Sequence, residues 1–330
     1  MLEKEETGKT HRFLIIQTAF IGDVVLATSL IEALGNSHPN GVIDVLVRKG
    51  NEQVLENNPK LNGILTWEKR TNKLINFFKL IWVIRSKQYD CIINLHRFFS
   101  SGLVTFLGNA RETIGFDKNP LSLFYTKAVK YKSAEGHHEI NRNFSLIEGR
   151  VPAQLARPKM YPSSEDFDKV VYLKKEPYYC VAPASVWFTK QYPKEHWVSL
   201  IKKSKYHVYL IGGQEDIGLC NDIKAEAEGD SIQNLSGKLS YLETAALMKD
   251  AAMNFVNDSA PLHFASAMNA PVTAYFCSTI PAFGFGPLSD NSKIMETHKS
   301  LLCRPCGLHG KKKCPQGHFE CAHSITNTDL

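Results

Sequence analysis

The sequence has no long apolar run. Near its beginning, charges of both signs surround an apolar stretch of only four residues, which ends before Gln17. A membrane-spanning helix needs about 20 consecutive apolar residues, and a secretory signal peptide needs a shorter apolar segment followed by a cleavage site. Neither pattern occurs, and internal repeats and low-complexity tracts are missing as well. We therefore expect a globular, cytoplasmic protein.

The sequence also lacks the glycine fingerprint of dinucleotide-binding proteins. The first predicted strand, residues 13–17, leads into TAFIGDVVLAT, where Gly-x-Gly-x-x-Gly would be needed to wrap a pyrophosphate. The missing fingerprint disfavours a nicotinamide-dependent oxidoreductase. That class remains an alternative because the order of strands and helices is Rossmann-like.

Short β-branched segments alternate with amphipathic segments along the chain, which is typical of an α/β fold with parallel sheets. The 330 residues are enough for two domains. A proline-rich segment, residues 151–164, separates two series of strands and predicts domains at 1–160 and 161–330. The predicted strands are residues 13–17, 42–47, 63–67, 89–95, 178–183, 207–211, 252–256 and 272–276. The predicted helices are residues 24–34, 72–86, 194–204 and 242–249.

Positive charge is concentrated in one segment of a chain whose formal net charge is +6. Residues 60–87 contain seven Lys or Arg residues and one acid, Glu68. This segment is either a solvated surface or a contact with an anionic ligand or membrane. Its predicted helix, residues 72–86, would pack on a sheet or lie on a membrane surface. The apolar residues of that helix are Leu74, Phe77, Phe78, Ile81 and Ile84.

Gly22 and Asp23 follow the first strand, at the beginning of the next helix. Ligands of open α/β sheets bind beyond the carboxyl ends of the strands. A carboxylate at this place would repel phosphate, but it could serve as a general base for a hydroxyl group. Asp23 could equally do no more than cap the helix.

Two loops of the second half are typical of phosphate-binding sites. Ser185, Thr189 and Lys190 follow the strand at 178–183, and their hydroxyl and ammonium groups suit a diphosphate. The strand at 252–256 leads into a helix start whose free N–H groups favour an anion. Capping alone would explain its Asp or Ser, and its His would either contact a ligand or be buried. The residues of this helix start are Asp258, Ser259, Ala260, Pro261, Leu262 and His263.

Two weaker loops could hold a nucleoside. Gln214 and Glu215 follow the strand at 207–211, and Leu239 lies in a loop before the helix at 242–249. A carboxylate can bind ribose hydroxyls, and an apolar side chain can contact a base. Either loop by itself is only a turn.

As a set, these segments resemble glycosyltransferase family 9, the ADP-heptose:lipopolysaccharide heptosyltransferases. The resemblance covers nearly the whole chain and is carried by FIGDVVLAT, YDCIINL, the segment around Lys190 and NDSAPLHFA. It implies a GT-B architecture, in which two Rossmann-like, doubly wound domains face each other across a cleft. The first domain would bind mainly the acceptor, and the second would bind the nucleotide sugar.

The resemblance also implies an inverting displacement with Asp23 and Lys190 as catalytic residues. Asp23 would take the proton of the acceptor hydroxyl, while Lys190 and its neighbouring hydroxyls hold the leaving diphosphate. The helix start at 258–263 would assist, and Gln214 or Glu215 and Leu239 would lie beside ribose and adenine. No metal ion would be obligatory for catalysis, because a cation and a helix N-terminus replace it.

The implied donor is ADP-heptose, and the implied acceptor is an anionic, lipid-anchored inner-core saccharide. The enzyme would then work peripherally at the inner face of the plasma membrane. Another nucleotide sugar, used in surface polysaccharide assembly, remains an alternative. From charge and position, the predicted acceptor-binding residues are Gly22, Arg97, Lys118, His138 and Arg142.

Four of the eight cysteines lie in a Cys-rich tail, residues 301–323. Their thiolates would bind a structural zinc ion if the side chains converge. The lysines at 311–313 make a nucleic-acid-binding finger an alternative. The position after two complete domains favours a structural tail, with or without zinc, and no nucleic-acid partner. The four cysteines are Cys303, Cys306, Cys314 and Cys321.

Overall fold

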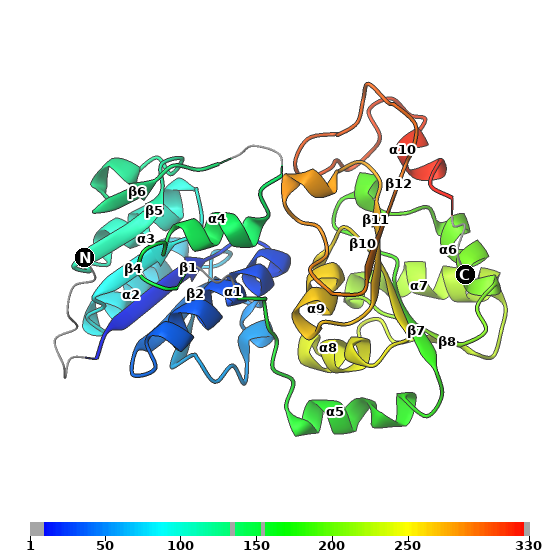
Figure 1. Cartoon of the computed structure of the whole chain (residues 1–330), viewed down its shortest axis with the longest axis horizontal. Coiled ribbons are helices and arrows are strands. Elements are labelled where there is room, and N and C mark those ends of the chain that lie inside the picture. Colours follow the sequence, from blue (N-terminus) through cyan, green and yellow to red (C-terminus); the bar gives the residue numbers. More distant parts are fainter. Residues whose placement is uncertain (1–9, 133–135, 153–155, 327–330) are drawn as a thin grey trace. The chain divides into compact units, whose positions relative to one another are not determined.

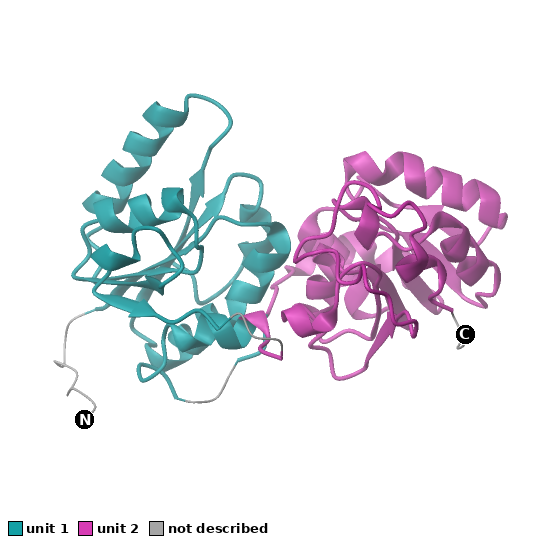
Figure 2. Cartoon of the chain, turned by 90° about the horizontal axis from the view of Figure 1, so that it is seen from above, with its two compact units in different colours: residues 1–133, 140–158 teal, residues 134–139, 159–330 magenta. Residues whose placement is uncertain are grey.

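The computed structural model describes residues 10–132, 136–152 and 156–326. The chain forms two compact units (Figure 2). Unit 1 comprises Met1–Ser133 and Ile140–Pro158, and unit 2 comprises Ala134–Glu139 and Lys159–Leu330. The main change of unit falls between Pro158 and Lys159, and the described residues 136–139 also belong to unit 2.

Unit 1 contains a parallel sheet whose described strands follow the order β3-β2-β1-β4-β5-β6 (Figure 1). The strands are β1 (Arg12–Gln17), β2 (Val42–Arg48), β3 (Gly63–Trp67), β4 (Cys91–Asn94), β5 (Glu112–Phe116) and β6 (Lys127–Val129). The helices are α1 (Ile21–Ser37), α2 (Lys73–Ser86), α3 (Phe99–Leu107) and α4 (Glu139–Ser145).

Unit 2 contains a second parallel sheet, in the order β12-β11-β10-β7-β8-β9 among the described strands. The strands are β7 (Tyr178–Ala182), β8 (His207–Leu210), β9 (Ile232–Asn234), β10 (Met253–Asn257), β11 (Val272–Phe276) and β12 (Ser292–Glu296). The helices are α5 (Ser164–Val170), α6 (Lys194–Lys202), α7 (Ile217–Ala227), α8 (Tyr241–Lys249), α9 (Ala260–Met268) and α10 (Glu320–His323).

Both sheets have the same topology. Counted within each unit, the strand order is 3-2-1-4-5-6, which is that of a doubly wound Rossmann-like fold. The chain reverses direction across the sheet between β1 and β4 in unit 1 and between β7 and β10 in unit 2. We call the side of a sheet at which its parallel strands end the carboxyl edge. The predicted α/β class with two Rossmann-like halves is confirmed.

The central strands are buried on both faces, and this burial makes them easy to predict from the sequence. The side chains from Phe13 to Ile16 in β1 are all buried, as expected for a parallel strand that is covered on both faces. The strands β6, β9 and β12 lie at the edges of the sheets, and the sequence analysis missed them together with β5. Among these edge strands, β6 and β9 are only three residues long and β12 is largely exposed, so they lack a continuous apolar signal.

Helix α2 follows its predicted bounds closely, but only one of its faces packs on the sheet. Ile81 and Ile84 are buried, and the Phe77 ring lies 6.0 Å from that of Trp67. The opposite face is solvent-exposed. Its exposed apolar side chains are Leu74 (74%), Ile75 (57%), Phe78 (65%) and Trp82 (71%). In the described part of the chain, no helix has the length and hydropathy required to cross a membrane.

Candidate functional site

A lysine and a carboxylate meet at the carboxyl edge of unit 2. Lys190 ends a 3-10 turn (Phe188–Lys190) after β7, and Asp258 directly follows β10. Lys190 Nζ lies 2.8 Å from Asp258 Oδ2, and the hydroxyl of Thr279 donates to the same oxygen at 2.6 Å. Asp258 is buried, so these two partners compensate a charge that would otherwise be costly. The arrangement fixes an ammonium group at the point where ligands of this fold bind.

Thr189 connects this loop to the Cys-rich tail. Its buried hydroxyl oxygen accepts hydrogen bonds from Ser278 Oγ at 2.9 Å and from the Lys311 amide at 2.8 Å. The Thr189 amide in turn donates to the Lys311 carbonyl at 3.1 Å. A Cβ atom on Gly310 would lie only 2.9 Å from a Lys190 side-chain carbon. The tail therefore packs against the loop that carries Lys190. The sequence did not indicate this contact.

Helix α9 begins beside the same pair, with Pro261 in its first turn as predicted. Ser259 occupies the N-cap position but makes no side-chain capping bond, and Asp258 is paired elsewhere. Capping therefore does not account for either residue. The Ala260 backbone belongs to this first turn, whereas the Leu262 side chain is buried in the core and offers a ligand only its backbone.

His263 is 5% exposed, and its Nδ1 has no hydrogen-bond partner among the described residues. Burial lowers the pKa of this imidazole to about 3, despite the opposing charge of Asp258. The ring is therefore neutral at physiological pH. Buried polar atoms are nearly always satisfied in proteins, so an orphaned nitrogen near Lys190 favours contact with a ligand over a purely structural role.

The two predicted nucleoside loops adjoin each other. Gln214 Nε2 donates to the Gly237 carbonyl at 2.6 Å, and the Gly237 amide donates to the Gly212 carbonyl at 2.9 Å. Gln214 and Glu215 are exposed, while Leu239 is half-buried on the adjoining loop. Ser185 lies half-buried in the loop after β7, and its carbonyl accepts from Gln191 Nε2 at 2.7 Å.

Asp23 lies at the carboxyl edge of unit 1, as predicted. It is the third residue of α1, after Gly22, and its Oδ2 accepts a hydrogen bond from the Phe20 amide at 3.2 Å. This bond caps the helix, so Asp23 has the capping role that the sequence also allowed. The same bond holds the carboxylate in place beyond the end of β1.

Three further polar side chains at this edge were not predicted from the sequence. Thr18 Oγ1 lies 3.0 Å from His96 Nδ1 and accepts from Lys69 Nζ at 3.2 Å. Burial and the neighbouring Lys69 lower the pKa of His96 to about 4, and burial with Arg48 lowers that of Lys69 to about 8. Each of the three follows a predicted strand by one or two positions. The rule that placed Asp23 would therefore have found them.

The predicted acceptor residues divide between the two units. Arg97 and Arg142 both face the ring of Tyr131, at 4.1 Å and 5.7 Å from its centre, so the structure brings these two guanidinium groups together. Lys118 is exposed in a turn after β5. His138 belongs to unit 2, where its Nε2 lies 3.0 Å from the Gly286 carbonyl oxygen.

The tail cysteines lie near one another without forming a closed ligand set. Cys306 Sγ is 3.2 Å from the Cys303 carbonyl, and Cys303 Sγ is 3.9 Å from His318 Nε2. Burial raises the pKa of Cys321 to about 11, and the other three tail thiols add to this effect. In the described chain, these thiols are not among the groups of three potential ligand atoms within 4.8 Å of one another. The zinc site stays a prediction.

Two parallel sheets of Rossmann order, each with polar side chains at its switch point, have the GT-B type of architecture. Residues 77–314 match the family described as Glycosyltransferase family 9 (heptosyltransferase), so the chain belongs to this family and is a glycosyltransferase. The resemblance seen in the sequence is confirmed, and the alternative of a nicotinamide-dependent oxidoreductase is wrong.

Individual relatives agree with the family. The chain is 27% identical over 291 residues to lipopolysaccharide heptosyltransferase 3 of Escherichia coli, covering 82% of this chain and 85% of the relative. A family 9 glycosyl transferase from Veillonella parvula has a similar structure, with a TM-score of 0.80, 21% identity and 88% of each chain covered. The E. coli ADP-heptose lipopolysaccharide heptosyltransferase II gives a TM-score of 0.77 at 22% identity, covering 94% and 96% of the two chains.

Proposed function

We propose that the protein transfers heptose from ADP-heptose to a saccharide of the lipopolysaccharide inner core. The names of the relatives support the sugar and the product class. The observation that carries the proposal is the pairing of Lys190 with Asp258 at the start of α9. An ammonium group and a helix N-terminus at one switch point suit a nucleoside diphosphate.

The leaving group explains why this arrangement would accelerate the reaction. As the bond between the anomeric carbon and ADP breaks, the electron pair stays on the diphosphate, which gains negative charge. Lys190 and the α9 amides would stabilise that charge more strongly in the transition state than in the ground state. Asp258 neutralises Lys190 in the absence of donor, and the diphosphate would compete with it for the ammonium group. These protein groups would make a catalytic metal ion unnecessary.

Asp23 is proposed as the general base. It would accept the proton of the acceptor hydroxyl while that oxygen forms the new bond to the anomeric carbon, with inversion. The cations of unit 1 support an anionic acceptor. Lys69 lies beside Thr18 at its carboxyl edge, and Arg97 and Arg142 both face the Tyr131 ring of the same unit.

The test is acceptor-dependent release of ADP from ADP-heptose with a heptose-deficient lipopolysaccharide core. Asp23→Asn should lower kcat by about 10²–10⁴ and leave ADP-heptose binding unchanged. Asparagine can still accept the Phe20 amide hydrogen bond, so the variant separates capping from catalysis. Glu148→Gln, an exposed acid of the same unit, serves as the control.

Either half of the proposal can fail separately. Undiminished turnover by the Asp23→Asn variant would exclude this residue as the base. Absence of ADP release with every core acceptor, while another nucleotide sugar is consumed, would replace heptose by that sugar.

The exposed face of α2 is proposed to contact the membrane that anchors the acceptor. Ile75, Phe78 and Trp82 follow helical spacing and are exposed, and Lys79 and Arg85 lie on the same helix. Aromatic and aliphatic side chains insert at the lipid boundary, and each nearby cation adds about 1 kcal/mol at an anionic surface.

Sedimentation with phosphatidylglycerol-containing vesicles tests this contact. The double variant Phe78→Ser/Trp82→Ser should lose most vesicle binding but retain activity on a lipid-free acceptor. The double variant Val171→Ser/Tyr172→Ser changes two comparably exposed residues of unit 2 and should bind vesicles normally. Equal binding by both variants would rule out α2 as the contact surface.

The tail cysteines are also proposed to hold a structural zinc ion. The proximity of Cys303 Sγ to His318 Nε2, at 3.9 Å, and of Cys306 Sγ to the Cys303 carbonyl, at 3.2 Å, supports the proposal. Cys306→Ser should then lower the zinc content of the purified protein by one equivalent, and an unchanged content would refute the site.

A further inference from the structure

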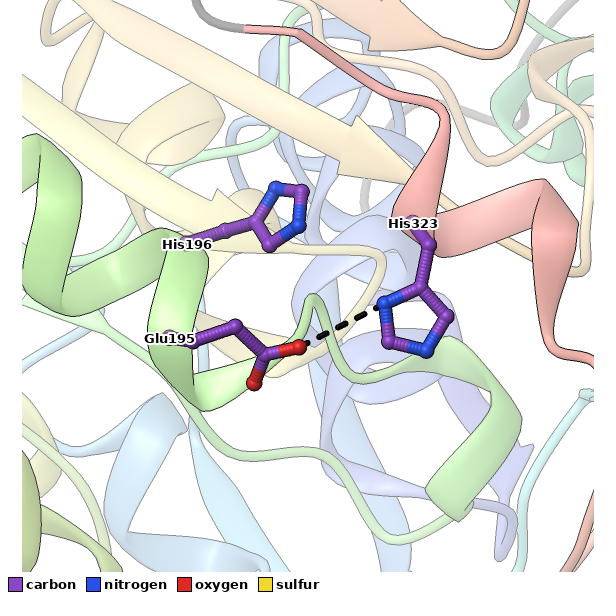
Figure 3. Close-up of side chains that lie close together, drawn as sticks. All are labelled: Glu195, His196 and His323. Atoms are coloured by element: carbon purple, nitrogen blue, oxygen red, sulfur yellow. Dashed lines mark ion pairs between the residues drawn. The ribbon is translucent and has the colours of Figure 1, made fainter.

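Two histidines and a glutamate meet in unit 2, away from the residues assigned to the donor. Glu195 and His196 lie in the first turn of α6, and His323 ends α10. One ligand atom of each lies within 4.8 Å of the others, and Glu195 Oε1 is 3.4 Å from His323 Nδ1 (Figure 3). Among the described residues, this is the group of three His, Cys, Asp or Glu side chains whose ligand atoms all lie within 4.8 Å of one another.

The His196 ring is held by a residue behind it. Its Nδ1 lies 3.0 Å from the hydroxyl of Tyr192, which donates its own proton to the Ile325 carbonyl at 3.1 Å. In the tautomer compatible with this arrangement, the hydroxyl oxygen accepts the Nδ1 proton and the Nε2 lone pair is available. The Tyr192 ring is buried and stacks on Tyr275 with 4.3 Å between ring centres, so this support is rigid.

Support of this kind is characteristic of metal-binding histidines, which commonly donate their second ring N–H to a fixed acceptor. The groups that face His196 from α10 and its own helix are His323 and Glu195.

We propose that Glu195, His196 and His323 form a binding site for a divalent transition-metal ion of the zinc type. Two imidazoles and one carboxylate are ligands that zinc, nickel and copper prefer over magnesium or calcium. Ligand atoms around a tetrahedral zinc ion are roughly 3.4 Å apart, given bonds of about 2.1 Å. The Glu195–His323 pair already has this spacing, and both side chains are exposed enough to close on His196 and to leave a position for water.

Such an ion would join the first turn of α6 to the segment that follows the Cys-rich loop. That segment carries Ala322 and Ile325 into the core of unit 2, and the preceding loop contacts Thr189 through Lys311. Metal binding would therefore stabilise the docking of the tail against the donor-binding unit. The inference does not depend on which sugar is transferred.

Zinc titration of the untagged, chelator-stripped full chain tests the site. The wild-type protein should bind one more equivalent than His323→Ala, and its Tm should rise by several degrees with zinc, as expected for binding to the folded state. His207→Ala, which removes an exposed histidine of the same unit paired with Glu176, should behave as wild type. Zinc bound by the tail cysteines is common to all three proteins and cancels.

Two further variants keep the outcome interpretable. Glu195→Gln is an exposed change and should also lose the equivalent, even if His323→Ala folds poorly. Tyr192→Phe removes only the hydroxyl that supports His196 and should weaken zinc binding by about 10–100-fold. Identical stoichiometry and identical zinc-induced Tm shifts in wild type, His323→Ala and Glu195→Gln would overturn the proposal.

Discussion

The carboxyl edges of the two sheets have the same topology but a different electrostatic organisation. In unit 2, Lys190 is neutralised by Asp258, and the surrounding hydroxyls are hydrogen-bonded to one another. In unit 1, Lys69, Arg97 and His96 lie near each other, and burial keeps His96 neutral. The edge of unit 2 is electrostatically balanced, because its cation is paired with a buried carboxylate. At the cationic edge of unit 1, Lys69 contacts a hydroxyl and an aromatic ring, and Arg97 contacts an aromatic ring.

Under the proposed function, this difference matches the two substrates that the fold would bind. A diphosphate site benefits from a cation kept in a fixed position, and a paired carboxylate provides that fixation. A site for a larger anionic saccharide benefits from several cations on separate loops. If this account is correct, removing equivalent charges from the two edges should have unequal effects.

The largest effect is expected at the balanced edge. Lys190→Ala should reduce kcat by roughly 10²–10³, because the group that stabilises the departing diphosphate is lost and Asp258 then faces the phosphates unpaired. Steady-state ADP release measures it, with Lys202→Ala on α6 as the control. A loss of less than threefold would show that the Lys190–Asp258 pair is structural.

Acid should act on unit 1 through His96. Its folded-state pKa of about 4 lies below the ordinary value of 6.5, so the folded state binds fewer protons between these values. Stability is therefore full above about pH 6.5 and falls as the pH decreases toward 4, by on the order of 1–2 kcal/mol at pH 5.

Urea unfolding at pH 7 and pH 5 measures this change in the free energy of unfolding. His96→Gln should lose less stability than wild type between the two pH values. Equal losses in both proteins would mean that His96 does not sense the acid.

The cationic edge should respond to single changes in acceptor binding. Arg97→Ala should raise the acceptor KM by about tenfold through loss of a charge-assisted contact, without changing the donor KM. Lys118→Ala provides the comparison, since this cation lies in an exposed turn, and it should change the acceptor KM little. If both variants behave alike, diffuse charge and not the Tyr131 cluster attracts the acceptor.

The smallest effect is expected at His263. His263→Phe should weaken ADP binding by about three- to tenfold, measured by calorimetry, because the orphaned Nδ1 can no longer meet a ligand. Its Tm should not fall, since a buried unsatisfied nitrogen is replaced by an apolar ring. Unchanged ADP affinity together with a lower Tm would instead assign His263 to the core.

The sequence predicted the central strands and the loops after them, because buried parallel strands and helix starts leave strong local patterns. Asp23, Lys190 and Asp258 were found in this way. Thr279 and Lys69 also follow predicted strands, but their role depends on partners distant in sequence. No local sequence pattern indicates that Arg97 and Arg142 both contact the Tyr131 ring, because the fold brings these residues together. The exposed face of α2 could not be distinguished from a packed one, because spacing alone does not show what covers a helix.

The contact between Thr189 and Lys311 has a consequence for biosynthesis. These residues are separated by 122 positions, so the loop that carries Lys190 is translated long before the backbone that completes its wall. At about 5–20 residues per second, the ribosome needs roughly 6–24 s to supply the missing partner. The hydrogen bonds around Thr189 can therefore be completed only after Lys311 has been synthesised, when all residues of unit 1 have already been translated.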